Sequence, residues 1–244
     1  MHNHRLPLAA GLALLLGACG GPGPAKDDSL RHFGQLGFKP CTLSGAGASG
    51  NVEAQCATFD VPENPAEPQG RKISLNVAWL PASNNVVATP DPVFFLAGGP
   101  GQAATEVAAL VNPSLREIRK QRDLFFIDQR GTGKSNPLDC LGEDGKELPI
   151  DELRQPSVEL MQDYAQRCAK SLLGRADTRF YTTTEAIGDL DAVRAALGVD
   201  KLNLIGGSYG TRVAQQYAAR FPQHTRSVVL DGVAPNDLVV GGEF

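Results

Sequence analysis

Short runs of apolar residues, bounded by polar or glycine-rich sequence, are the clearest pattern in the chain. Four of them occupy residues 92–97, 123–127, 202–205 and 227–230. A strand that is apolar on both faces is typical of a parallel sheet covered by helices on each side. Stretches with helical periodicity separate these runs, so the sequence predicts an α/β fold with a mostly parallel sheet flanked by helices.

Helical periodicity is visible in three stretches. The first follows Met161, the second starts with Thr182 and Glu185 at capping-box spacing and ends at Gly198, and the third ends before Pro222. The repeating apolar positions are Tyr164, Cys168 and Leu172; Ile187, Leu190, Val193 and Leu197; and Ala214, Tyr217 and Ala218. We expect the last set to line the inner face of its helix.

Nearer the N-terminus the pattern predicts strands of a different kind. Residues 52–61 end at Pro62, and residues 72–80 alternate apolar and polar side chains. Such alternation is typical of a half-exposed antiparallel strand. We therefore expect an antiparallel pair at one edge of the sheet, preceded by residues 27–51, which show no clear period.

A glycine-serine motif occupies the junction between one apolar run and the helix that follows it. Residues 206–210 read Gly-Gly-Ser-Tyr-Gly, with Ser208 at the centre. A serine in such a strand-to-helix elbow takes a strained backbone conformation, and Gly206 and Gly210 avoid the collisions that side chains would cause. Because the strain exposes the hydroxyl above the sheet edge, the sequence predicts Ser208 as a catalytic nucleophile.

A second glycine-rich turn directly follows the run at residues 92–97. Its Gly98 and Gly99 precede Pro100, and consecutive glycines let backbone N–H groups face an approaching oxyanion. The residue after an elbow nucleophile supplies the second such donor. We therefore expect an oxyanion hole made by Gly98 or Gly99 together with Tyr209.

Residues 128–135 invite comparison with a phosphate-binding P-loop, because they end in Gly-Lys-Ser. The comparison fails, since a P-loop needs glycine where this chain has Asp128 and must begin a helix, whereas the helix breaker Pro137 follows. We expect a turn at a strand end, in which Asp128 accepts hydrogen bonds from backbone N–H groups and Arg130 pairs with an acid.

The motifs at residues 97–101, 128–135 and 206–210, in this order and spacing, resemble the proline iminopeptidase and tripeptidyl-aminopeptidase-like branch of the α/β-hydrolases. The resemblance extends over residues 41–240. It implies an α/β-hydrolase fold and a serine exopeptidase that releases residues or short peptides from peptide N-termini through an acyl-enzyme, without a cofactor. One departure is Ala97, where the family loop often has His. The substitution affects any role of that His and leaves the glycine donors unchanged.

A serine nucleophile needs a base, usually a histidine oriented by a carboxylate. Beyond Ser208 the sequence offers His224, which lies in a turn where the family places a surface residue at the far end of the sheet. His32 precedes the sheet and is no better placed. Asp231 follows the last apolar run at the correct edge and is a candidate acid, although the resembled branch takes its acid from one strand later.

The resembled family continues with a cap domain, two more strands, the acid and the histidine. We therefore expect residues 41–244 to be a partial hydrolase core, truncated after the strand that follows the nucleophile helix and inactive alone. The run at residues 227–230 would then form an exposed sheet edge able to associate with another chain. The substrate is expected to be a peptide or a small acyl compound. An esterase- or lipase-type hydrolase and a non-catalytic remnant or binding module stay open as alternatives, because the cap that selects the substrate is absent.

The N-terminus has the form of an export signal. Arg5 precedes an apolar segment too short for a stable membrane anchor, and residues 16–19, Leu-Gly-Ala-Cys, resemble a bacterial lipoprotein cleavage site. We expect residues 1–18 to be removed, Cys19 to carry lipid and residues 19–40 to form a tether and N-terminal segment. The protein would then be exported and anchored to the membrane at the cell envelope. An ordinary signal peptide cut near Ala18 is the alternative.

Charge and cysteine content narrow the partners. The net charge is −4 and no run of basic residues is present, which argues against nucleic acid. In an oxidising compartment the remaining cysteines favour two disulfides, and we expect Cys41–Cys56 and Cys140–Cys168 because each closes a short loop. Buried free thiols are the alternative. Metal binding is not expected, since no CxxC spacing or neighbouring histidine accompanies these cysteines.

Overall fold

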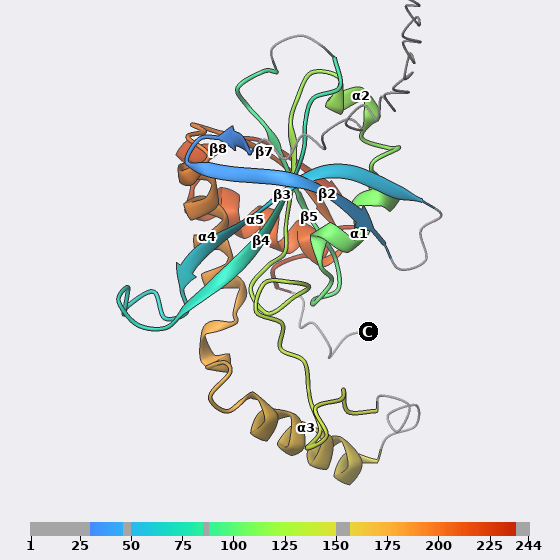
Figure 1. The fold of residues 1–244 in the computed structure, drawn as a ribbon, viewed down its shortest axis with the longest axis vertical. Helices are drawn as coiled ribbons and strands as arrows, with labels where there is room; N and C mark the ends of the chain where they lie inside the picture. The colour runs from blue at the N-terminus through green and yellow to red at the C-terminus, as the bar shows by residue number, and fades with distance from the viewer. Residues whose placement is uncertain (1–29, 46–49, 85–87, 150–156, 238–244) are drawn as a thin grey trace, which may run out of the picture.

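The computed structural model describes residues 30–45, 50–84, 88–149 and 157–237, which form one mixed eight-stranded sheet in the order β1-β2-β3-β4-β6-β5-β7-β8 (Figure 1). The strands are β1 Arg31–Phe33, β2 Leu36–Ser44, β3 Asn51–Pro62, β4 Lys72–Leu80, β5 Val93–Leu96, β6 Leu124–Ile127, β7 Leu202–Gly207 and β8 Thr225–Asp231. Strands β6, β5, β7 and β8 are parallel, and β1 to β4 pair antiparallel, as does β4 with β6. The expected α/β fold is confirmed.

The N-terminal part of the sheet is larger than the sequence predicted. Strands β3 and β4 do form an antiparallel pair, but β1 and β2 lie outside them, so this pair is not at the edge. Leu36 and Phe38 of β2 pack in the core on one face of the sheet and Leu43 in the core on the other. The apolar side chains of β2 therefore lie on one face of the sheet at the start of the strand and on the other face at its end. This explains why the apolar residues of the segment 27–51 follow no single period. The sheet begins ahead of the expected boundary at residue 41, and His32 lies within β1 instead of before the sheet.

Helices cover both faces of the sheet, each over its own apolar core (Figure 1). The helices α4 Thr183–Ala196 and α5 Tyr209–Arg220 pack on one face, and α1 Ala104–Val111 with the short α2 Arg116–Arg119 pack on the other. Because all four residues of β5 and of β6 are buried, the centre of the sheet is apolar on both faces, as the continuous runs predicted.

The helix ends partly follow the sequence signals. Gly198 follows α4 with a φ of +68°, as expected of a C-terminal glycine. The predicted capping box does not form, because the side chains of Thr182 and Glu185 hydrogen-bond each other and no backbone N–H is capped by Thr182. Helix α5 ends at Arg220 as predicted, and Ala214 and Tyr217 are buried, whereas Ala218 is only partly buried.

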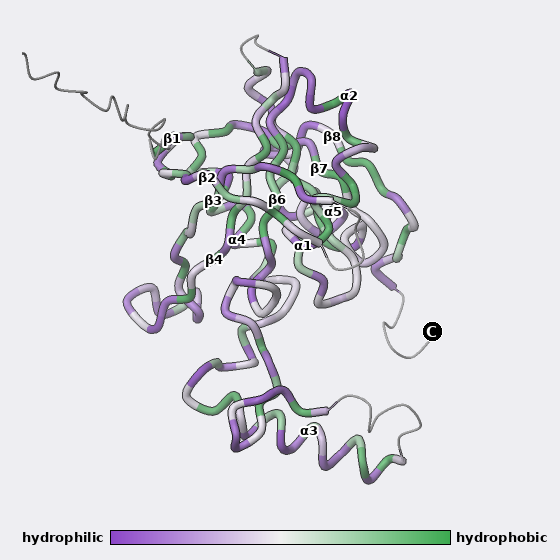
Figure 2. The backbone as a smooth tube through the Cα atoms, turned by 45° about the vertical axis from the view of Figure 1, so that its right-hand side comes forward, coloured by the Kyte–Doolittle hydropathy of each residue, from purple (hydrophilic) through white to green (hydrophobic). Residues whose placement is uncertain are grey.

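One helix stands away from the sheet. Helix α3, Val158–Leu172, and residues 140–149 form an arm at the bottom of Figures 1 and 2. Of the helix residues only Leu172 is buried, and Met161 is exposed. The hydropathy of the arm alternates along its length, in contrast to the apolar centre of the sheet (Figure 2). The predicted helix is confirmed, but it does not cover the sheet.

Both expected disulfides are present. Cys41–Cys56 joins β2 to β3 with a Cα–Cα distance of 5.8 Å, and Cys140–Cys168 ties the loop of the arm to α3 with a Cα–Cα distance of 4.5 Å. The second bond explains how a helix with so little buried surface is held in place, because it links the helix covalently to the chain that leaves the sheet.

Two remaining expectations concern the exposed edge of the sheet and the N-terminal export signal. Strand β8 lies at the end of the sheet order, and Val229 is 54% and Leu230 37% exposed there. Association of this edge with another chain stays a prediction. Residues 1–18 and Cys19 lie outside the described residues. Within the described residues, none of the helices has the length and apolar character to cross a membrane.

Candidate active site

Ser208 occupies a sharp corner between β7 and α5. Its φ of 51° and ψ of −121° are rare for a residue with a side chain, and its side chain is exposed at the carboxyl end of the sheet. A Cβ on Gly206 would lie 2.4 Å from the Gly210 carbonyl oxygen, and a Cβ on Gly210 would lie 2.0 Å from the Leu96 carbonyl oxygen. Only glycine fits at both positions, so these two residues allow the corner to form against β5.

The turn after β5 lies against this corner. A Cβ on Gly98 would be 3.3 Å from the Cβ of Ser208, and Gly99 has a φ of +99°. The Gly98 N–H donates to the side-chain oxygen of Gln102 at 3.2 Å, whereas the N–H groups of Gly99 and Tyr209 have no hydrogen-bond acceptor within the described part of the chain. Of the two expected candidates in this turn, Gly99 is therefore the one whose N–H is available to an oxyanion.

The end of β8 supports the elbow from the other side. The Ser208 N–H donates to the Asp231 carbonyl at 2.8 Å, and the Thr211 hydroxyl accepts from the Ala234 N–H at 2.8 Å. Thr211 also donates its hydroxyl proton to the Ser208 carbonyl at 2.6 Å. The backbone of the corner is thus hydrogen-bonded on both sides, which holds Ser208 in its strained conformation.

A buried carboxylate anchors the far end of the glycine turn. Asp128 accepts hydrogen bonds from the backbone N–H of Thr105 and the side-chain amide of Asn76 at 2.9 and 2.8 Å, and from the Lys134 N–H at 3.3 Å. Thr105 is in the first turn of α1, directly after the glycine turn. The expected role of Asp128 is confirmed, and no helix begins at residues 133–135, which agrees with the rejection of the P-loop.

Arg130 pairs with an acid, as expected, and the acid is Asp189 of α4. Two hydrogen bonds of 2.6 and 2.7 Å join the two side chains, and both are buried. Arg130 also donates to the Glu63 carbonyl at 2.8 Å. Burial raises the pKa of the Asp189 carboxyl, and the guanidinium opposes that rise. The pair links the loop after β6 to the helix beside the elbow.

A pocket of about 360 Å³ opens beside the serine. It is lined by Phe95, Gly98, Gln102, Val107, Leu110, Val111, Gly207, Ser208, Asp231 and Gly232. A strained, exposed serine, free backbone N–H groups beside it and an adjoining pocket together form a site suited to acyl transfer.

A model of one protein family, described as the alpha/beta hydrolase fold, matches residues 91–241, which is more than half of the chain. The chain belongs to this family. The match covers β5 to β8, the glycine turn and the elbow, so the family assignment and the site rest on the same part of the molecule.

The hydrolase chain also has relatives with peptidase names. It is 32% identical over 212 residues to serine protease Hip1 of Mycobacterium tuberculosis, and 31% identical over 190 residues to tripeptidyl aminopeptidase of Streptomyces lividans. These matches cover 82% and 73% of this chain but 40% and 35% of the relatives, so the chain spans less than half of their length. The resemblance to this branch is confirmed.

Among solved structures, proline iminopeptidase of Mycobacterium smegmatis is similar, with a TM-score of 0.43 and 21% identity. The match covers 70% of this chain and 42% of that one.

The described histidines of this hydrolase chain do not approach Ser208. The Nδ1 atom of His224 lies 2.8 Å from a carboxylate oxygen of Asp191, and its ring stacks on Phe221. His224 precedes β8 at the end where Leu202 begins β7, six residues before Ser208, which corresponds to about 20 Å along a strand. His224 is therefore not the base, as the sequence indicated. Burial opposes ionisation of Asp191, but hydrogen bonds from Arg194, Tyr217 and His224 outweigh it and lower its pKa.

Asp231 lies at the expected edge. The residue lines the pocket beside Ser208, and its role as the acid stays a prediction. Sequence reasoning missed Gln102, Thr211 and Asp189. A glutamine directly after the glycine turn and a threonine in the first turn of α5 were visible signals for the first two, because hydrogen-bonding side chains at these positions can reach local backbone groups.

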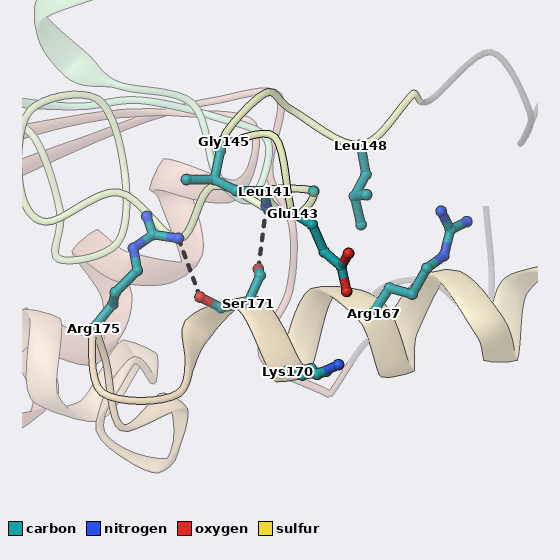
Figure 3. Close-up of a pocket in the computed structure, with 9 residues that line it drawn as sticks. Leu141, Glu143, Gly145, Leu148, Arg167, Lys170, Ser171 and Arg175 are labelled. Carbon is teal, nitrogen blue, oxygen red and sulfur yellow. Dashed lines mark hydrogen bonds between the residues drawn. The ribbon is translucent and has the colours of Figure 1, made fainter.

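A larger cavity, of about 530 Å³, lies in the arm and shares no lining residue with the pocket at Ser208 (Figure 3). Arg167, Lys170 and Ser171 of α3 form one side of it, and the loop with Leu141 and Leu148 forms the other. We assign the chemistry to the smaller pocket, because it contains the strained serine. Within the described ranges, no group of three or more His, Cys, Asp or Glu side chains could hold a metal ion.

Proposed function

We propose that this chain supplies the nucleophile and the oxyanion hole of an exported serine peptidase that removes residues or short peptides from peptide N-termini. The observation that carries the proposal is Ser208 at a φ of 51°, exposed beside the free N–H groups of Gly99 and Tyr209. The names of the relatives, a serine protease and a tripeptidyl aminopeptidase, support a peptide as the substrate.

The reaction would proceed in two half-reactions. The Ser208 Oγ attacks the scissile carbonyl carbon while its proton passes to a general base, and the resulting oxyanion accepts hydrogen bonds from Gly99 and Tyr209. The C–N bond then breaks and the amine leaves with that proton. Water hydrolyses the acyl-enzyme by the same route in reverse. The base, a histidine in such sites, comes from outside the described residues, and Asp231 is a candidate to orient it.

Covalent labelling tests the nucleophile. The protein as its gene encodes it is treated with a fluorophosphonate probe, and the modified peptide is identified by mass spectrometry. We expect the adduct on Ser208, its loss in Ser208→Ala, and unchanged labelling in Ser83→Ala, which removes an exposed serine outside any elbow. An unlabelled Ser208, or a stoichiometric adduct elsewhere, contradicts the proposal and favours a non-catalytic role.

Peptide substrates separate an aminopeptidase from the other hydrolases. Fluorogenic tripeptides are compared with a free and with an acetylated N-terminus, alongside a simple aryl ester. An aminopeptidase cleaves the free peptide at least a hundredfold faster than the acetylated one. Equal rates on both peptides, or turnover of the ester alone, reject the exopeptidase assignment and favour an endopeptidase or an esterase.

Export and anchoring form a separate part of the proposal. Residues 1–18 would be removed and Cys19 would carry lipid, so the wild-type protein is expected in the membrane fraction of its bacterium. In Cys19→Ala it would keep its signal or appear free of the membrane. A wild-type protein that fractionates without membrane argues for an ordinary signal peptide.

A further inference from the structure

The pocket beside Ser208 has apolar walls built from the core of the fold. Phe95 comes from β5, and Val107, Leu110 and Val111 come from α1, which follows the glycine turn. Val107 is buried, whereas Leu110 is 64% exposed at the mouth of the pocket. An apolar surface that leads from solvent to a reactive serine is typical of a ligand site.

The position of Ser208 indicates which part of a substrate this pocket receives. In acyl transfer the acyl group stays bonded to the serine Oγ through both half-reactions, while the leaving group departs after the first. Ser208 itself lines the apolar pocket. A second hollow, of about 170 Å³ and lined by Thr183 and Tyr209 among others, does not include Ser208. The acyl group, which stays bonded to Ser208, is therefore the part of the substrate that we place in the apolar pocket.

Size and charge restrict this group further. A volume of about 360 Å³ is at the lower end of the range for small-molecule sites, which suits one branched aliphatic or aromatic side chain. Four of the lining side chains, Phe95, Val107, Leu110 and Val111, are apolar, so an anionic group would lose its hydration there without gaining a partner from them.

We infer that the pocket formed by Phe95, Val107, Leu110 and Val111 is the acyl subsite of this protein, and that it selects a neutral, apolar side chain next to the scissile carbonyl. The inference rests on the proposed function of Ser208 as nucleophile. Leu110 is the specificity-determining residue that can be changed most safely, because it is exposed and its replacement leaves no cavity in the core.

The test measures labelling rates for alkyl fluorophosphonates of increasing chain length, on the protein as its gene encodes it. Each methylene buried in the pocket is expected to raise the second-order rate constant by up to about fourfold, until the pocket is full. A reagent with a terminal carboxylate should react at least tenfold more slowly than the neutral reagent of equal length.

The decisive variant is Leu110→Asp, with Leu173→Asp as the matched control. Leu173 is 76% exposed and lies at the end of α3, outside the pocket. We expect Leu110→Asp to lose at least tenfold with the longest reagent and little with the ethyl reagent, which also shows that the elbow is intact. The control should match wild type. Labelling that is equal for all chain lengths, or equal in both variants, overturns the subsite and leaves the proposed function intact. Failure of every reagent to label Ser208 overturns both.

Discussion

The contact between α5 and β5 makes a direct prediction about the elbow. Gly210 is the second residue of α5, and a Cβ added there would lie 2.0 Å from the carbonyl oxygen of Leu96 and 2.7 Å from that of Ala97. Ordinary contacts begin at about 3.4 Å, and both oxygens belong to the backbone at the end of a central strand. Neither can move without shifting the strand, so Gly210→Ala must separate α5 from β5.

The expected cost follows from that overlap. Overpacking in a core costs about 1–3 kcal/mol, and because the colliding atoms here are backbone we expect a loss of roughly 3 kcal/mol or more. Gly188→Ala is the matched control, since Gly188 also lies in a helix, α4, and its added Cβ would meet nothing within 4 Å. Alanine is favoured over glycine in a helix by about 1 kcal/mol, so this variant should be slightly more stable.

Urea unfolding of the 244-residue chain, followed by the fluorescence of the buried Trp79, measures both variants against wild type. The same chemical change should shift the unfolding midpoint in opposite directions at the two sites. In the protein as its gene encodes it, labelling of Ser208 should also fall in Gly210→Ala and stay unchanged in Gly188→Ala. If Gly210→Ala is as stable as Gly188→Ala, then the close approach of α5 to β5 does not exist and the account of the elbow is wrong.

Three other outcomes test the residues around the site. Arg130→Met leaves the buried Asp189 carboxylate unpaired and should cost about 3–5 kcal/mol at pH 7 in urea unfolding. Because burial raises the pKa of Asp189, the loss should shrink as the pH is lowered and the carboxyl takes up a proton, and a pH-independent loss would contradict this. Gln102→Ala removes the hydrogen bond that holds the turn beside Gly99, and should slow labelling of Ser208 by about fivefold with little change in stability. Asp191 has a lowered pKa, so its stabilisation is present above the ordinary carboxyl pKa and disappears as the pH falls through the lowered value. Asp191→Asn should therefore flatten the acid limb of stability against pH, and an unchanged acid limb refutes its role.

Much of the fold was readable from local patterns. The four parallel strands β5 to β8 coincide with the apolar runs. Strands β5 and β6 are buried along their whole length because the sheet is covered on both faces there, whereas β8 at the edge is mostly exposed. Strands β1 and β2 were not readable, since Leu36 and Leu43 of the same strand pack on opposite faces and Pro40 lies between them. The period predicted helix α3 but not its position away from the sheet, because the disulfide Cys140–Cys168 holds this helix where apolar burial does not.

The sequence by itself determined the elbow: glycines two residues before and after Ser208, between a strand and a helix, admit only a narrow set of backbone conformations. Chain order also set the pairing of the cysteines, because short loops close at low entropic cost. The tertiary structure decided which glycine N–H stays available to an oxyanion, because the side-chain oxygen of Gln102 accepts a hydrogen bond from the Gly98 N–H. It also decided that Arg130 pairs with Asp189, 59 residues further along the chain. Local backbone geometry depends on neighbouring residues, so it can be predicted from the order of residues in the chain. Partners that are far apart in sequence meet only when the sheet and its helices have packed.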